Sequence, residues 1–138
     1  MCSPGWSYNP TTGACYGVNK LPPRLSWMGA EEYCEKSGGH LASFQTQEEY
    51  EHLLSYFFVS WDEMWIGIYS DDGEKWKTVE GHEIDILKFG KWCTNGYPGK
   101  FDGKHCLGFG STEGVNHCFH NHDCSTYKMR IICKKQIF

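Results

Sequence analysis

Residues 26–43 read Ser-Trp-Met-Gly-Ala-Glu-Glu-Tyr-Cys-Glu-Lys-Ser-Gly-Gly-His-Leu-Ala-Ser. Ser26 can cap a helix, because its hydroxyl can accept a hydrogen bond from a backbone N–H of the first turn. The apolar positions that follow fall on one helical face: Trp27, Ala30 and Cys34. The pair Gly38-Gly39 then ends the helix, since glycine readily adopts the left-handed conformation found after many helices.

A second helix and a strand are predicted directly after this stretch. Thr46 and Glu49 have the spacing of a capping box, in which each side chain satisfies a free backbone donor of the other residue. Four apolar residues then recur at helical spacing: Tyr50, Leu53, Leu54 and Phe57. The run Trp65-Ile66-Gly67-Ile68 is short and apolar, which favours a buried strand.

The flanking regions alternate between turns and short strands. Residues 2–19 surround a turn-forming stretch at 9–13, which predicts an N-terminal hairpin stapled by Cys2 and Cys15. Residues 71–104 are rich in Gly, Asp, Asn and Lys, so we expect a long loop region, and loops of that length are mostly functional. Strands are expected again over residues 106–109, 115–119 and 129–133.

Eight cysteines in 138 residues are the strongest compositional signal. An even number at this density is typical of a disulfide framework made in an oxidising compartment, so we expect a secreted, extracellular protein. We interpret Met1, directly before Cys2, as a residue placed ahead of a mature secreted sequence that has no signal peptide. No run of about 18 apolar residues occurs, so we expect no membrane insertion.

Several function classes find no support in the sequence. The net charge of −4 disfavours nucleic acid and anionic lipid as partners, because both select basic surfaces. The motifs His-Glu-x-x-His and Gly-x-Ser-x-Gly are absent, and no cysteine is expected to be free to act as a nucleophile. We therefore predict that the protein is not an enzyme.

The order of the motifs resembles a long-form C-type lectin-like domain over essentially all 138 residues. The resemblance rests on the spacing of several elements together: Ser26 to Cys34, Gly39 to Ser43, Trp65 to Ile68, Cys106, Cys124 and Ile132-Cys133. It implies a single α+β domain over residues 1–138, with two helices, short antiparallel sheets and a long loop region. Disulfides staple such a domain.

The resemblance also implies a pairing of the cysteines, which sequence spacing alone does not determine. The implied bonds are Cys2–Cys15, Cys34–Cys133 and Cys106–Cys124. Cys93 and Cys118 remain, and a similar extra pair occurs in some lectin-like domains. An intrachain Cys93–Cys118 bond would fix the long loop to the last strands, whereas an interchain bond would give a dimer. The sequence therefore leaves monomer and dimer open.

Sugar-binding members of this family hold calcium with two oxygen-rich motifs, and neither is kept here. The first maps to Tyr97-Pro98-Gly99 and the second to Phe119-His120-Asn121, while Lys104-His105 replaces a usual acid. Calcium needs six to eight oxygen ligands, so we expect no calcium at this position. A shift of one or two residues that lets Asp102 or Asp123 contribute is the alternative.

A second calcium position of the family is also altered. Its usual ligands are a serine, two acids early in the second helix and an acid after the last cysteine. The matching residues are Ser43, Gln45, Glu49 and Lys134. We predict that the Lys134 ammonium group replaces the ion and pairs with Glu49, as an exposed ion pair worth about 0–1 kcal/mol.

Three histidines fall within six residues, at His117, His120 and His122, with Asp123 beside them, and His105 is a candidate neighbour of this cluster. Residues 120 and 122 would point to the same side of a strand. Imidazole is a common zinc ligand, so a zinc or copper site at these three histidines is one interpretation. Solvated imidazoles in a polar loop are the other.

The sequence thus predicts a non-catalytic recognition domain that binds an extracellular glycoconjugate or protein without calcium. The residues expected to form this surface are Tyr97, Pro98, Gly99, Lys100, Phe101, Phe119, His120 and Asn121. Tyr97 could stack on a sugar face or anchor a protein partner. The alternatives are a calcium-dependent carbohydrate-binding lectin with a shifted site, a zinc-dependent binder that uses the histidines, and an ice- or mineral-surface binder.

Overall fold

The computed structural model describes residues 2–19, 22–93, 103–112 and 115–137. These residues form helices α1 (Trp27–Lys36) and α2 (Gln47–Ser60) and a 3-10 turn, η1 (Ile86–Lys88). The strands in chain order are β1 (Trp6–Asn9), β2 (Ala14–Gly17), β3 (His40–Leu41), β4 (Met64–Ser70), β5 (Trp76–Thr78), β6 (Glu83–Ile84), β7 (His105–Thr112), β8 (Val115–Asp123) and β9 (Cys133–Gln136). The predicted α+β class is confirmed. None of the described helices is long and apolar enough to cross a membrane.

Both helices begin where the sequence predicts. The Ser26 hydroxyl accepts a hydrogen bond from the backbone N–H of Gly29 at 3.1 Å. At α2, Oγ1 of Thr46 accepts from the N–H of Glu49 at 3.2 Å, and a Glu49 carboxylate oxygen accepts from the N–H of Thr46 at 3.2 Å. Helix α1 ends just before Gly38, whose φ of 90° confirms the predicted glycine stop.

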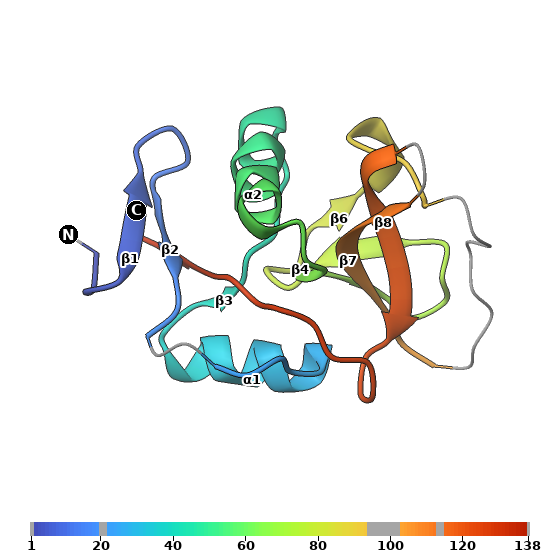
Figure 1. The fold of residues 1–138 in the computed structure, drawn as a ribbon, viewed down its shortest axis with the longest axis horizontal. Coiled ribbons are helices and arrows are strands. Elements are labelled where there is room, and N and C mark those ends of the chain that lie inside the picture. Colours follow the sequence, from blue (N-terminus) through green and yellow to red (C-terminus); the bar gives the residue numbers. More distant parts are fainter. Residues whose placement is uncertain (1, 20–21, 94–102, 113–114, 138) are drawn as a thin grey trace.

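The first sheet joins the two ends of the described chain. Its strand order is β1-β2-β9-β3, and all its neighbours are antiparallel. Figure 1 shows the N- and C-termini close to each other beside β1. The predicted last strand, 129–133, is shifted to β9, because Met129 and Arg130 form only isolated bridges with Leu25 and Met64.

The second sheet includes two short strands from the region where the sequence predicts a loop. Its strand order is β6-β5-β4-β7-β8, again antiparallel throughout. The prediction of a continuous loop over 71–104 is wrong where β5, β6 and η1 form. These strands are only three and two residues long, which is too short to show an alternating pattern. Strands β7 and β8 also extend beyond the predicted 106–109 and 115–119.

The core is built from aromatic side chains that join α2 to the second sheet. Rings from α2, β7, β8 and the segment after β3 pack edge-to-face or stacked: Phe44, Tyr50, Phe109 and Phe119. Beside this cluster, β3 passes close to β4 at Gly67. A Cβ atom at Gly67 would lie 2.3 Å from the backbone oxygen of Leu41, so only glycine permits this approach.

All eight cysteines form intrachain disulfides: Cys2–Cys15, Cys34–Cys133, Cys93–Cys118 and Cys106–Cys124. The three bonds implied by the resemblance are confirmed. The fourth bond is intrachain, which decides between the two alternatives for Cys93 and Cys118. Cys34–Cys133 spans 99 residues, and closing so long a loop contributes about 4–5 kcal/mol in the chain-entropy model.

Candidate functional site

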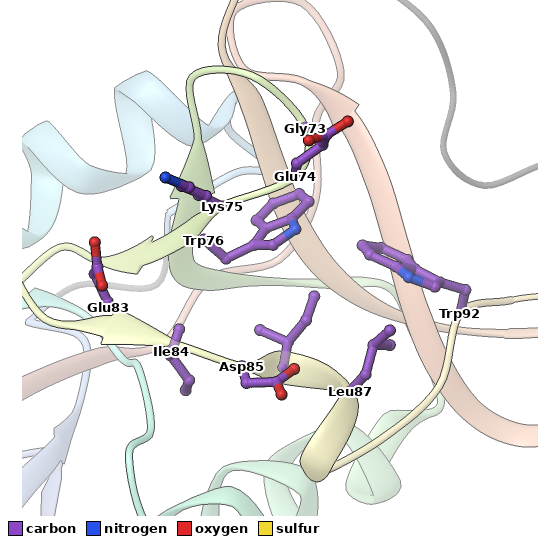
Figure 2. A pocket seen from close by; sticks show the side chains of 10 residues that line it. Gly73, Glu74, Lys75, Trp76, Glu83, Ile84, Asp85, Leu87 and Trp92 are labelled. Carbon is purple, nitrogen blue, oxygen red and sulfur yellow. The ribbon is translucent and has the colours of Figure 1, made fainter.

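A groove with two tryptophans on its walls opens beside β5 and β6 (Figure 2). Its volume is ≈ 600 Å³, and its lining residues are Gly73, Glu74, Lys75, Trp76, Glu83, Ile84, Asp85, Ile86, Leu87 and Trp92. The rings of Trp76 and Trp92 lie 5.6 Å apart between centroids. Trp76 is buried, Trp92 is half-buried and Leu87 is 57% exposed. The groove therefore combines apolar surface with carboxylates that can accept hydrogen bonds, as ligand sites commonly do.

One rim of the groove is a turn held by Asp72. Its carboxylate accepts hydrogen bonds from the backbone N–H groups of Lys75 and Glu74, at 2.9 and 2.8 Å, and from the Ser70 hydroxyl at 2.9 Å. These bonds lower the pKa of Asp72 to about 2. Because the carboxylate stays ionised at physiological pH, it fixes the backbone that carries Gly73, Glu74 and Lys75 into the groove.

The predicted ligand-binding residues fall into two groups. Five lie outside the residues that the structure describes: Tyr97, Pro98, Gly99, Lys100 and Phe101. The other three are consecutive on β8, so their side chains alternate between the two faces of the sheet. Phe119 is 1% exposed and stacks on Phe109, so its assignment to a binding surface is corrected to a core position.

Asn121 is already engaged by a neighbouring strand. Its side-chain amide nitrogen lies 3.0 Å from Nδ1 of His105, a residue on β7 that is 6% exposed. His105 belongs to the pair Lys104-His105, which stands where the resemblance implies an acid. An imidazole thus binds the amide that remains from the second calcium motif, in place of a carboxylate that could share an ion with it.

The second calcium position contains the predicted ion pair. Nζ of Lys134, on β9, lies 2.9 Å from a carboxylate oxygen of Glu49 on α2, and 3.6 Å from one of Glu80. The pairing is confirmed, but the expectation that it is exposed is wrong. The side chains of Lys134 and Glu49 are 4% and 14% exposed. Both charges are largely removed from water, so breaking the pair is costly.

The pKa values of this pair shift in opposite directions. Burial alone would raise the pKa of Glu49, but the hydrogen bond and charge of Lys134 outweigh it and lower this pKa. Burial would lower the pKa of Lys134, but the hydrogen bond to Glu49 and the charges of Glu49 and Glu80 raise it. Both groups are therefore held ionised, and an ammonium group lies where the resemblance implies a cation.

The three clustered histidines do not share one site. His117 points toward α2, where its ring lies 5.5 Å from that of Phe58 and 6.4 Å from that of Tyr50. His120 and His122 lie on the opposite face of β8, with ring centroids 5.3 Å apart. The predicted set of His117, His120 and His122 is therefore corrected, because odd and even positions of a strand face opposite sides.

A glutamate from another element completes the histidine pair. Donor atoms of Glu63, His120 and His122 all lie within 4.8 Å of one another. Glu63 comes from the segment between α2 and β4, far from β8 in the sequence. Tyr127 donates a hydrogen bond to a Glu63 carboxylate oxygen at 2.7 Å and stacks on His122 with centroids 3.8 Å apart. We call Glu63, His120 and His122 the histidine–glutamate cluster.

Residues 23–135 match the family described as the lectin C-type domain. This chain belongs to the C-type lectin family. This C-type lectin domain is 31% identical to rheacalcin-2 of Rhea americana over 111 residues, which cover 70% of this chain and 73% of that protein. It is 28% identical over 138 residues to the secretory phospholipase A2 receptor of Mus musculus, and these cover 99% of this chain but 9% of the receptor.

A solved C-type lectin domain shares the same fold. The carbohydrate-recognition domain of the mouse scavenger receptor C-type lectin superposes with a TM-score of 0.73 at 22% identity, covering 99% of this chain and 98% of that one. C-type lectin-like domains are generally non-catalytic binding domains, and the match indicates no enzyme family. The family supplies the scaffold, and the residues of the site decide what it binds.

Sequence reasoning missed Glu63 and Tyr127 as parts of this C-type lectin's histidine cluster. Neither residue lies in a metal-binding motif, and both come from outside β8. The spacing of the histidines gave the strand face, but only the packing of the segment before β4 against β8 brings the carboxylate to it. The groove beside β5 and β6 was missed for the same reason, since its walls come from several short elements.

Proposed function

We propose that this C-type lectin domain is a secreted, non-catalytic recognition module that binds an extracellular glycoconjugate or protein without calcium. Two observations support calcium independence: at the sugar-site position the Asn121 amide lies 3.0 Å from Nδ1 of His105, and at the second position Nζ of Lys134 lies 2.9 Å from Glu49. A second cation beside this ammonium group would meet direct repulsion in a largely buried place. The four disulfides support an oxidising, extracellular location.

The groove between Trp76 and Trp92 is the surface that we assign to the ligand. Its exposed apolar residue, Leu87, can contact the C–H face of a sugar or an apolar side chain of a partner. The carboxylates of Glu83 and Asp85, which line it, can accept hydrogen bonds from hydroxyl or amide groups. This surface lies in the region, residues 71–104, where the sequence predicts a functional long loop.

The test is binding of the oxidised protein to a broad glycan panel and to immobilised extracellular glycoproteins, once with calcium and once with a chelator. We expect the same signal in both arms. Signal that appears only with calcium would overturn the proposal and favour a site shifted to Asp102 or Asp123. Asp123 already accepts hydrogen bonds from Thr126 and Ser125, at 2.5 and 3.3 Å, which disfavours that shift.

A matched pair of variants tests whether the ligand binds in the groove. Leu87→Ala removes an exposed side chain of the groove, and we expect affinity to fall about 5- to 10-fold, which corresponds to roughly 1 kcal/mol. Val59→Ala is the control, because Val59 is 83% exposed on α2 and does not line the groove. Equal loss in both variants would argue against the groove. Binding to ice or mineral in place of glycan and protein would instead identify a surface binder.

A further inference from the structure

The histidine–glutamate cluster contains a buried nitrogen that the rest of the fold leaves unsatisfied. Nε2 of His122 is inaccessible to solvent and has no hydrogen-bond partner among the residues that the structure describes. A carboxylate oxygen of Glu63 lies 4.0 Å from this nitrogen, which is too far for a hydrogen bond. A buried polar atom without a partner is unusual in a folded protein and calls for an explanation.

The surrounding residues hold the three donors in place. His122 stacks on Tyr127 on one side and meets the ring of Trp65 edge-on at 6.2 Å. His120 lies over β7, where a Cβ atom at Gly110 would come within 1.9 Å of its ring. Tyr127 fixes one oxygen of Glu63 by its hydrogen bond, so the other oxygen faces the histidines. Packing and hydrogen bonds that orient the ligand side chains in this way are typical of metal sites.

Nearby charges leave the cluster available to a cation. Arg24 and Arg130 are the basic side chains beside it, and both pair with Asp62. Within the described residues, the only ion-pair contact of Glu63 is the one with His122. Burial lowers the pKa values of His120 and His122, which favours the neutral imidazole that binds a metal through its lone pair.

We propose that Glu63, His120 and His122 bind a zinc ion. Two imidazole nitrogens and one carboxylate oxygen are a set that zinc accepts, with a fourth position left for water or a donor from a partner. Ligands of a tetrahedral zinc lie about 3.4 Å apart, given bond lengths near 2.1 Å, so a small side-chain rotation closes the 4.0 Å gap. Calcium is disfavoured, because it takes oxygen ligands.

The neighbouring sulfur atoms do not contribute. Cys93 and Cys118 also lie within 4.8 Å of His120, but they are joined as a disulfide and offer no thiolate. Glu31, Glu35 and His40 form another group of donors in the described chain. There, Glu31 already accepts hydrogen bonds from His40 at 2.6 Å and from the backbone of Leu41 at 2.8 Å, so two of the three members already have partners.

The test is titration of metal-stripped, oxidised protein with zinc in competition with a chromogenic chelator. We expect one ion per chain, and Glu63→Gln, His120→Gln and His122→Gln should each weaken binding roughly tenfold or more. The matched control is His117→Gln, which changes a histidine on the opposite face of the same strand. It should leave zinc affinity unchanged. Loss of binding in His117→Gln with retention in His120→Gln would overturn the assignment, as would wild-type protein that binds no zinc.

Cobalt substitution gives a second readout that does not depend on how well each variant folds. Cobalt in the wild-type site should show the visible absorption of a four-coordinate ion, and excess zinc should remove it. Calcium should neither compete nor raise the melting temperature. Absence of a zinc-displaceable cobalt spectrum would overturn the proposal. This outcome is separate from the glycan test, because zinc binding and calcium-independent recognition stand on different residues.

Discussion

Two places in this domain bring a glutamate close to buried nitrogen atoms, and they differ in whether the protein itself supplies the positive charge. Between α2 and β9, Lys134 supplies the positive charge itself, 2.9 Å from Glu49. Between β8 and the segment before β4, Glu63 faces two neutral imidazoles, and Nε2 of His122 has no partner in the described residues. The first place is closed to ions by an internal cation, whereas the second offers lone pairs and one negative charge.

The lost calcium position and the proposed zinc site can both be judged by one criterion. The criterion is whether each buried donor already has a partner from the protein. At Glu49 the ammonium group satisfies the carboxylate, so a metal adds repulsion. At His122 nothing in the described chain satisfies the nitrogen, so a metal adds a bond. Mutations that remove the partner of Glu49, or that change the contacts around His120 and Glu63, test this criterion.

The largest effect should come from Lys134→Met. This change leaves the carboxylate of Glu49 largely buried without its cation, and we expect a loss of about 2–4 kcal/mol in the free energy of unfolding. Denaturant unfolding with the disulfides intact measures it. The double variant Glu49→Gln/Lys134→Met is the control, and it should recover most of the loss because the buried Glu49 charge is removed too, while Glu80, 27% exposed, stays in contact with water. A Lys134→Met protein as stable as wild type would contradict the burial of the pair.

The same pair predicts a pH dependence of stability. The pKa of Glu49 is lowered in the folded state, so its contribution is fully present above the ordinary carboxyl pKa and is lost as pH falls through the folded value. The pKa of Lys134 is raised, so its contribution is present below the ordinary lysine pKa and is lost as pH rises through the folded value. The stability difference between wild type and the double variant should therefore be constant from about pH 5 to pH 10 and decline outside this range. A difference that varies near pH 7 would contradict it.

Replacing the internal cation should open the first place to calcium. In Gln45→Glu/Lys134→Glu, oxygen ligands return at the positions that the family resemblance implies, beside Ser43 and Glu49. We expect calcium to stabilise this variant by about 2–3 kcal/mol at a hundredfold excess over its dissociation constant, and to leave wild type unchanged. Thermal unfolding with calcium or with a chelator measures the gain. Glu49→Gln in the same background should abolish it.

The sequence predicts the features of these two sites that depend on local spacing, and it does not predict those that depend on tertiary packing. Both helices, with their caps, follow from local spacing, and the family resemblance paired Glu49 with Lys134 across the fold. Burial of that pair could not be predicted, because it depends on how β9 packs beside α2. Glu63 could not be predicted either, since its approach to His120 requires the tertiary arrangement of β4, β7 and β8.

A smaller effect is expected at Gly110, which makes room for His120. Its alanine Cβ would lie 1.9 Å from the His120 ring, so Gly110→Ala must displace the ring or the strand. We expect a stability loss of about 1–3 kcal/mol, together with weaker zinc binding. In the His120→Ala background the same change should be nearly neutral for stability, because the colliding ring is gone. Additive losses in the double variant would show that the collision is not the cause.

The smallest and most specific effect should come from Tyr127→Phe. Burial and the hydrogen bond to Glu63 raise the pKa of Tyr127 to about 12, so the phenol remains a donor at physiological pH. Its removal should cost about 1 kcal/mol of stability and weaken zinc binding roughly tenfold, because Glu63 loses the contact that orients it. Phenylalanine keeps the ring that stacks on His122, so the change removes only the hydroxyl. A double-mutant cycle with Glu63→Gln tests whether the hydroxyl acts through Glu63. If it does, its effect on zinc affinity disappears in the Glu63→Gln background, and an undiminished effect there would contradict this role.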